Sequence, residues 1–418
     1  MRALIMTFGT RGDIQPYAAL AGALSRSGHD VTLAIPDEMS DLVPEAGSGR
    51  IDVAPAGSAM LRTVQELLPE MSGVRDASRS LRIMRDAMRQ HLDETRRAAE
   101  ATSPDIIVYH PKCLGGPHLA EMLGVPGVLS LPLPFYTPTG EFPAPLFGGA
   151  SFGRRGNRAT YAVGRASSVM YAGMIRDFRR QLGLAGDFGR FTNPLVNPDG
   201  TAVHVLYPYS RHVVPVPADY PPTAHVTGYW FLDAPDSHLS EDVQHFLDAG
   251  DAPVYVGFGS MGFGKGAEQR RDAVLEAFAR TGLRGIVATG WGGIAPGDAP
   301  SDDVLMIEGA PHEVLFPRCS AVVHHGGAGS TAAGLRAGKP SLVVPFLGDQ
   351  PFWGSRVHAL GAGPSPVPPK RLARDFADRL AQLVGAPNYA RRAIEVGDRI
   401  RTEDGLAEGV RVLERLAE

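Results

Sequence analysis

Short apolar segments alternate with helical stretches through both halves of the 418-residue chain. In the first half these segments are Arg2–Phe8, Asp30–Ile35, Asp105–Tyr109 and Gly127–Leu131. In the second half they are Pro253–Phe258, Arg284–Ala288, Val304–Ile307, Ala321–Val323 and Ser341–Pro345. Apolar strands that alternate with helices form a parallel sheet whose two faces are both covered by helices. We therefore predict an α/β protein built from doubly wound, Rossmann-like sheets.

A chain of this length exceeds what one hydrophobic core usually serves, so we expect two domains. The stretch Tyr207–Phe231 is rich in proline, which breaks regular structure, and it is typical of an interdomain linker. The expected division is an N-terminal domain at 1–206, the linker at 207–231 and a C-terminal domain at 232–400. Residues 401–418 would form a last helix that could pack back on the first domain. Ligands bind at the carboxyl ends of the strands in such folds, so a cleft between the domains is the expected site.

Composition argues against several classes of function. The formal net charge of −4 gives no electrostatic footprint for nucleic acid. Cys113 and Cys319 lie in different halves and form neither a disulfide framework nor a metal-ligand pattern. No apolar stretch approaches the roughly 18–20 residues that span a bilayer, and the chain start lacks a cleavage-like segment. We expect a cytoplasmic monomer or homodimer that acts on small molecules.

The segment VVHHGGAGST at 322–331 carries the clearest chemical signal. A predicted strand ends at Val323, two histidines and a glycine-rich turn follow, and Ser330 opens a predicted helix. Glycines let the backbone approach a ligand closely, and the first amides of a helix attract anions. The segment therefore favours a phosphate or diphosphate site. The alternative is a tight strand-to-helix turn with structural histidines, and His324 in particular is expected to be buried.

Three further motifs accompany this turn: MTFGTRGDIQP at 6–16, GFGSM at 257–261 and PFLGDQPFWG at 345–354. With this combination the chain resembles, over essentially its whole length, the nucleotide-sugar-dependent glycosyltransferases of family one. The resemblance is greatest to sterol glucosyltransferases and to antibiotic-modifying bacterial members. It implies the two-domain GT-B fold and inverting transfer of a hexose to a hydrophobic acceptor. The expected donor is UDP-glucose, with a TDP-sugar as the other choice.

The resemblance implies that the second domain holds the donor diphosphate. His325, directly before the glycines, would bind the phosphates. Ser260, in the glycine-rich turn after the second domain's first strand, would touch the same group. The rest of the cradle would be formed by Gly327, Ala328, Gly329, Ser330 and Thr331.

Asp349 and Gln350 match the family's acid–amide pair that binds hydroxyls of the donor sugar. A carboxylate accepts hydrogen bonds from sugar hydroxyls, and an amide both donates and accepts. Asp349 could instead cap the helix that follows it. For the nucleobase and ribose, the resemblance points to Pro311 and His312, whereas Trp291 could stack on the base or belong to the core.

The resemblance assigns the general base to Asp13 in TRGDIQP, where plant relatives carry a histidine. A carboxylate is a weak base for a free alcohol, but it suffices when the proton leaves late in the reaction. Asp13 could also cap the helix that begins near Pro16. His110 ends a strand expected beside the first strand, so it could contact Asp13 or the acceptor hydroxyl. A structural histidine bonded to a nearby carbonyl is the alternative.

The stretch 131–155 after a first-domain strand is rich in Pro, Gly and aromatic residues. Phe135, Tyr136, Phe142 and Phe147 could wall an apolar acceptor pocket, or they could anchor a surface loop. The predicted helix at 157–182 could form another wall, contact a membrane surface that holds a lipid acceptor, or pack in the core.

No cofactor and no metal is expected, because no DxD-like acidic cluster stands in these motifs. Two other classes of function stay open. One is a GT-B nucleotide-sugar epimerase, which needs no acceptor pocket. The other is a nucleotide-binding protein without catalysis that activates a partner enzyme.

Overall fold

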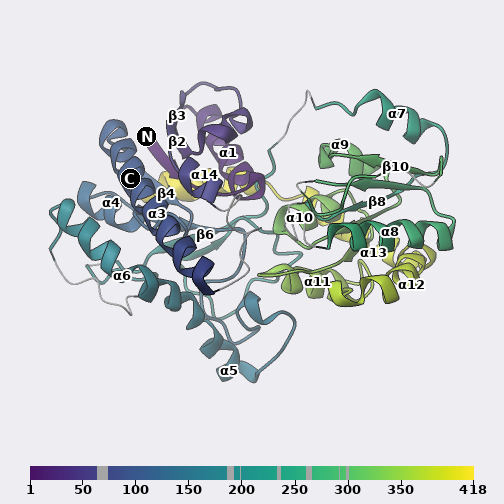
Figure 1. Ribbon diagram of the computed structural model, residues 1–418. Helices are drawn as coiled ribbons and strands as arrows, with labels where there is room; N and C mark the ends of the chain where they lie inside the picture. Colours follow the sequence, from purple (N-terminus) through teal and green to yellow (C-terminus); the bar gives the residue numbers. More distant parts are fainter. Residues whose placement is uncertain are drawn as a thin grey trace.

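The computed structural model describes residues 1–63, 74–185, 193–197, 199–232, 237–259, 266–290, 292–297 and 301–418. Two α/β domains lie side by side, each with one sheet covered by helices (Figure 1). The predicted α/β class with two doubly wound sheets is confirmed. Strands Asp30–Ile35 and Val304–Ile307 have the bounds that their apolar runs predict.

The first domain has a seven-stranded parallel sheet in the order β3-β2-β1-β4-β5-β6-β7. The side chains of β1 alternate between the two faces, so that Leu4 and Met6 enter one core and Ala3 and Ile5 enter the other. Its strands are β1 Arg2–Met6, β2 Asp30–Ile35, β3 Ile51–Pro55, β4 Ile106–Tyr109, β5 Gly127–Ser130, β6 His204–Tyr207 and β7 Ala224–Val226. Its α-helices are α1 Arg11–Arg26, α3 Val74–Thr102, α4 Gly116–Leu123, α5 Gly153–Thr160, α6 Val163–Gln181 and, from the chain end, α14 Gly405–Ala417.

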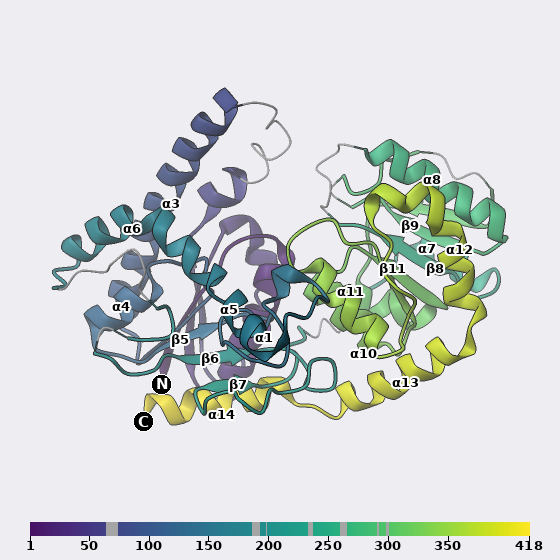
Figure 2. The same cartoon turned by 90° about the horizontal axis from the view of Figure 1, so that it is seen from below.

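The second domain has a five-stranded parallel sheet in the order β10-β9-β8-β11-β12. Its strands are β8 Val254–Gly257, β9 Gly285–Ala288, β10 Val304–Ile307, β11 Ala321–His324 and β12 Ser341–Val343. Its α-helices are α7 Glu241–Asp248, α8 Ala267–Thr281, α9 His312–Leu315, α10 Ala328–Arg336, α11 Gln350–Ala359, α12 Leu372–Gly385 and α13 Pro387–Arg401. Helices α10 and α11 lie on the side that faces the first domain (Figures 1 and 2).

The stretch 207–231, expected to be linker, contributes a strand to the first sheet. Strand β7 pairs in parallel with β6, with Leu206 opposite His225. Proline is tolerated around this strand because β7 is short and lies at the sheet edge, where one row of backbone N–H groups needs no partner. The first domain therefore extends past residue 206, to at least Val226.

Helix α14 lies against the first domain, after α13 has crossed from the second (Figure 2). Its residues Val410, Val412 and Leu413 are buried in the same core as the inner face of α1. The Trp230 indole N–H donates to the Gly405 carbonyl at 3.0 Å. The chain end thus completes a core that the first domain begins.

Candidate active site

Asp13 lies in the first turn of α1, directly after β1. Helix α1 begins at Arg11, one turn earlier than the expected start near Pro16, because Thr10 and Asp13 bond to each other there. The Thr10 backbone N–H donates to Asp13 Oδ2 at 3.0 Å, and the Thr10 hydroxyl donates to the same oxygen at 3.3 Å. Gly9, at φ 135°, makes room for this carboxylate, since a Cβ there would lie 2.2 Å from Asp13 Oδ2. Asp13 therefore does stabilise the helix start, and its second oxygen faces elsewhere.

The second oxygen of Asp13 pairs with a residue that sequence reasoning missed. Lys112 Nζ lies 2.5 Å from Asp13 Oδ1, and both side chains are partly exposed. Burial by itself raises the pKa of Asp13, but the Lys112 charge, the neighbouring His110 and the bonds from Lys112 and Thr10 outweigh it. The net result is a lowered pKa, so Asp13 is ionised at neutral pH. Lys112 is the single lysine before residue 265, which is the one signal the sequence offered.

His110 follows β4 and is buried. Its backbone N–H donates to the Met6 carbonyl at 2.9 Å, and its Nδ1 accepts the Lys112 backbone N–H at 3.0 Å. Burial first, and then the Lys112 charge, lower the pKa of His110 to about 3, so the ring is neutral. The histidine thus shapes the turn that carries Lys112, and a catalytic role for it stays a prediction.

The glycine turn of the second domain joins β11 to α10. His325 lies between two backbone turns: a Cβ on Gly327 would lie 2.5 Å from His325 Nε2, and one on Gly259 would lie 3.4 Å from His325 Cε1. Its Nδ1 is buried without a hydrogen-bond partner among the described residues. Burial lowers the pKa of His325 to about 4. A buried imidazole nitrogen with no protein partner fits a site completed by a ligand.

The neighbouring residues of the turn divide into two groups. Thr331 is fully buried and donates its hydroxyl to the Gly327 carbonyl at 2.9 Å, so it holds the turn. Ala328, Gly329 and Ser330 form the first turn of α10 and are not fully buried. Their amides are those that an α-helix leaves without intrahelical partners, so this end of α10 suits an anion. His324 is buried, as expected, and its Nδ1 accepts the Gly326 N–H at 3.0 Å.

Asp349 and Gln350 lie at the start of α11. Asp349 occupies the position before the helix, and its Oδ2 accepts the Trp353 indole N–H at 2.8 Å. Burial raises the pKa of Asp349, and the charge of Asp13 in the other domain raises it further. Gln350 is buried, and its side-chain oxygen accepts the N–H groups of Phe346 and Leu347 at 2.7 and 3.1 Å. The two residues hold the loop before α11, and their contact with a sugar stays a prediction.

A second residue that sequence reasoning missed is Arg11, which is exposed at the start of α1. Its charge acts on His312, the first residue of α9, whose pKa is lowered to about 4 by burial, by His325 and by Arg11. The His312 ring stacks on Phe316 at a centroid distance of 4.2 Å, and Pro311 precedes the helix. Arg11 is thus a first-domain cation whose charge reaches His312 of the second domain. Two expected donor residues, Ser260 and Trp291, lie outside the described residues.

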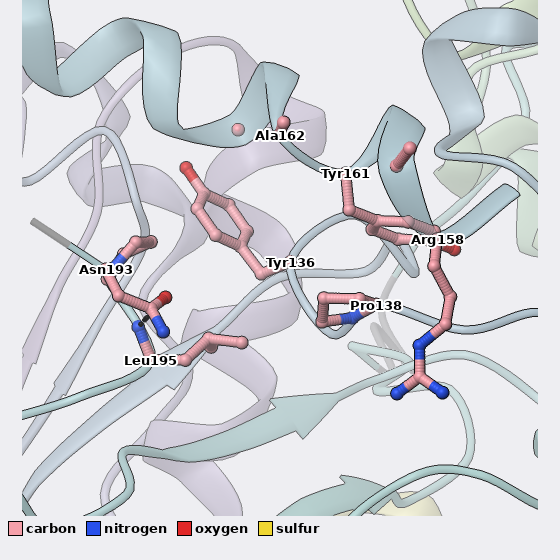
Figure 3. Close-up of a pocket in the computed structure, with 10 residues that line it drawn as sticks. Tyr136, Pro138, Arg158, Tyr161, Ala162, Asn193 and Leu195 are labelled. Atoms are coloured by element: carbon pink, nitrogen blue, oxygen red, sulfur yellow. Dashed lines mark hydrogen bonds between the residues drawn. The ribbon is translucent and has the colours of Figure 1, made fainter. Parts of the chain in front are cut away.

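A cavity of about 190 Å³ in the first domain has Tyr136 on its wall, between Asn193 and Tyr161 (Figure 3). Tyr136 also lines a neighbouring cavity, and the two share Gly164, Asn193 and Pro194. The second cavity contains Pro111 and Cys113, the residues on either side of Lys112. Most of its wall is apolar or aromatic, including Tyr109, Leu114, Leu129, Tyr171, Ile175 and Val203. This cavity therefore adjoins the turn that carries Lys112, although neither Lys112 nor Asp13 lines it.

The other three predicted aromatic residues are elsewhere. Phe135 packs edge-on against Tyr136 at a ring distance of 5.4 Å. Phe142 contacts Phe352 of α11 at 6.1 Å, so it joins the two domains. Phe147 is exposed beside Phe152. Of the four, Tyr136 lines these two cavities and the other three line neither, so the pocket roles of the other three stay predictions.

The described part of the chain shows neither a metal-binding cluster nor a membrane-spanning helix. No group of three or more His, Cys, Asp or Glu side chains there could hold a metal ion. In the same residues, every helix is too short or too polar to cross a bilayer.

Family models and relatives agree with this arrangement. Residues 3–139 match the Glycosyltransferase family 28 N-terminal domain, and residues 297–416 match the Erythromycin biosynthesis protein CIII-like, C-terminal domain. The sterol 3-beta-glucosyltransferase UGT80A2 of Arabidopsis thaliana is 34% identical over 98% of this chain, which covers 65% of that protein. The O-mycaminosyltylonolide 6-deoxyallosyltransferase of Streptomyces fradiae is 33% identical over 100% of this chain and 98% of its own length.

Solved structures share the architecture at lower identity. The glycotransferase of kitacinnamycin aligns with a TM-score of 0.72 and 20% identity over 99% of this chain and 98% of its own. The glycosyltransferase SnogD from Streptomyces nogalater aligns with a TM-score of 0.69 and 21% identity over 100% of both chains. The fold, the two matched domains and the relatives all indicate the same family. The chain belongs to the GT-B glycosyltransferases, the family that includes the sterol glucosyltransferases and the antibiotic glycosyltransferases.

Proposed function

We propose that the protein transfers a hexose with inversion from a nucleotide sugar to a hydroxyl of a hydrophobic acceptor. The observation that carries the proposal is the position of Asp13, an ionised carboxylate that pairs with Lys112 at 2.5 Å. Across the cleft stand the His325 turn and Asp349, whose pKa responds to the charge of Asp13. These residues support a reaction in which Asp13 of the first domain acts as the base and the His325 turn of the second domain holds the anion.

In the proposed reaction, the acceptor oxygen attacks the anomeric carbon of the donor from the first-domain side. The new carbon–oxygen bond forms as the bond between that carbon and the diphosphate breaks, and the diphosphate keeps the electron pair. The acceptor proton passes to the Asp13 carboxylate. Attack opposite to the leaving group inverts the anomeric configuration, and proton transfer to a positioned carboxylate typically contributes about 10²–10⁴-fold.

The leaving diphosphate would be held by His325 and by the first amides of α10. Donors fixed in place where negative charge develops stabilise a transition state without reorganisation. The unpartnered His325 Nδ1 and the absence of a side-chain cap on α10, among the described residues, support this role. No metal ion enters this scheme, and metal independence stays part of the proposal.

The proposed acceptor is a sterol or a polyketide or macrolide natural product. The cavity lined by Pro111 and Cys113 supports it, because aromatic and aliphatic walls suit a large apolar alcohol. The named relatives act on both kinds of acceptor, a sterol in one case and a tylonolide in the other. We favour UDP-glucose as donor on the likeness to the sterol glucosyltransferases, with a TDP-sugar as the second choice.

The test is a panel of UDP- and TDP-sugars, each assayed with hydrophobic alcohols including a sterol and a macrolide aglycone. We expect a glycoside whose anomeric configuration, read by NMR, is opposite to that of the donor. An isomerised donor without a glycoside would instead indicate an epimerase. Nucleotide binding without any turnover would indicate an activator of a partner enzyme, and either result would overturn the proposal.

A further inference from the structure

We propose that Lys112 is a positioning residue of the transfer reaction, which holds the Asp13 carboxylate ionised and oriented to receive the acceptor proton. The inference rests on the proposed function, since it assigns Lys112 to the same site.

The two carboxylate oxygens of Asp13 accept hydrogen bonds from different residues. Oδ2 accepts both the N–H and the hydroxyl of Thr10, whereas Oδ1 accepts from Lys112 at 2.5 Å. A carboxylate oxygen has two lone pairs, so Oδ1 keeps one for a substrate hydroxyl. Two donors on different elements also fix the rotation of the carboxylate group. The side chains of Asp13 and Lys112 are 25% and 43% exposed, which leaves the pair accessible to an acceptor from the cleft.

The turn after β4 fixes the position of the Lys112 backbone. The Lys112 N–H donates to His110 Nδ1 at 3.0 Å, and the Cys113 N–H donates to the His110 carbonyl at 2.8 Å. Cys113 is 1% exposed, so the chain on that side of Lys112 is anchored in the core. From this turn the lysine side chain reaches Asp13.

Lysine at this position stands out in a chain that otherwise uses arginine. The sequence has four lysines among 41 lysines and arginines together. An ammonium is a compact point charge that can occupy one side of a carboxylate oxygen, whereas the planar guanidinium tends to bind both oxygens. At Asp13 the oxygen Oδ2 already accepts two bonds from Thr10, so a bidentate partner would compete with Thr10.

The charges around Asp13 explain why a cation is needed. Tyr17 of α1 and His110 and Cys113 after β4 surround it, and Asp349 faces it from the second domain. Burial raises the pKa of both carboxylates, and Lys112 is the charge that acts on both of them to lower it. Loss of the Lys112 charge would therefore favour the protonated form of Asp13, and a protonated Asp13 is no base.

The first experiment compares the pH dependence of kcat/KM in the wild type, K112M and K112R. We expect the acid limb to move to higher pH in K112M, with a loss of about tenfold on that limb and recovery of most activity at alkaline pH. K112R keeps the charge, so its acid limb should stay at the wild-type position even if its rate is lower. K370M, which removes an exposed lysine of the second domain, makes the same chemical change as a control. A uniform loss in K112M at every pH would overturn the inference.

The second experiment does not depend on turnover. Protein labelled with ¹³C in the Asp carboxyl groups is titrated by NMR, and D13N assigns the Asp13 resonance. The Asp13 carboxyl should titrate at higher pH in K112M than in the wild type. An unchanged titration would overturn the role of Lys112 whatever the enzyme catalyses. A shifted titration in a protein that transfers no sugar would instead leave the ion pair standing and refute the proposed function.

Discussion

His110 and His324 occupy equivalent places in the two sheets. His110 follows β4, which pairs with β1, and His324 ends β11, which pairs with β8. Each ring is buried and accepts, through Nδ1, the backbone N–H two residues further along, at 3.0 Å in both cases. The two domains differ directly after these histidines. The first domain continues into Lys112, beside a carboxylate, and the second continues into the glycine turn proposed to bind the diphosphate.

Replacing Asp13 should separate catalysis from donor binding. D13N keeps the size of the side chain but removes the carboxylate, so transfer should fall by about 10²–10⁴-fold. Affinity for the nucleoside diphosphate, measured by calorimetry, should stay at the wild-type value because Asp13 belongs to the other domain. Weakened nucleotide binding with a normal rate at saturation would reverse the assignment.

Replacing His325 should have the opposite effect. H325A removes the ring between Gly259 and Gly327, and with it the hydrogen bond proposed for the diphosphate. The dissociation constant of the nucleoside diphosphate should rise roughly 10- to 100-fold, the range for a lost hydrogen bond to a charged group. H325Q, which keeps a donor, should recover part of the affinity. Full affinity in H325A would show that the turn binds the donor without the imidazole.

Gly9 provides a test of the carboxylate position that leaves Asp13 itself intact. In G9A the new methyl group would lie 2.2 Å from Asp13 Oδ2, at a φ of 135° that alanine avoids. We expect a rate loss near that of D13N. The free energy of unfolding should also fall by about 1–3 kcal/mol, which lowers the melting temperature by several degrees. G173A is the matched control, because a Cβ at that exposed glycine of α6 meets nothing within 4 Å. A fully active G9A would mean that the Thr10–Asp13 geometry is not needed.

His91 of α3 predicts a pH dependence of stability. Its ring is 1% exposed, packs against Phe8, and has no hydrogen-bond partner for either nitrogen among the described residues. Burial lowers the pKa of His91 to about 4, against about 6.5 in an unfolded chain. The unfolded state therefore binds more protons between these values, so the free energy of unfolding falls as the pH is lowered through that window.

H91F should remove this dependence. The stability difference between H91F and the wild type should grow on acidification by about 2 kcal/mol between neutral pH and about pH 5. Urea unfolding at a series of pH values measures it, with H238Q as a control at an exposed histidine. Parallel curves for H91F and the wild type would contradict the prediction.

Chelation tests the proposed charge stabilisation of the leaving group. If His325 and the amides of α10 replace a metal ion, excess EDTA should leave the transfer rate unchanged. A rate lost with EDTA and restored by Mg²⁺ would require an ion that the proposed scheme lacks.

The sequence predicts those parts of the fold that depend on local pattern. Fully apolar runs such as Val304–Ile307 are bounded by polar residues, so their limits are plain. Strand β3 was missed because Ile51–Pro55 has only partly buried side chains, and β7 was hidden among prolines. Contacts between distant residues were out of reach. Lys112 lies 99 positions from Asp13, and Phe142 packs on Phe352 of the other domain, which no local motif reveals.

The position of α14 affects how related enzymes can be recombined. Helix α1, which carries Asp13 in its first turn, packs against the last residues of the chain. A chimera that exchanges everything after residue 231 would thus also exchange the support of the base, along with the donor domain. A second crossover before Gly405, which keeps each α14 with its own α1, would swap the donor site alone.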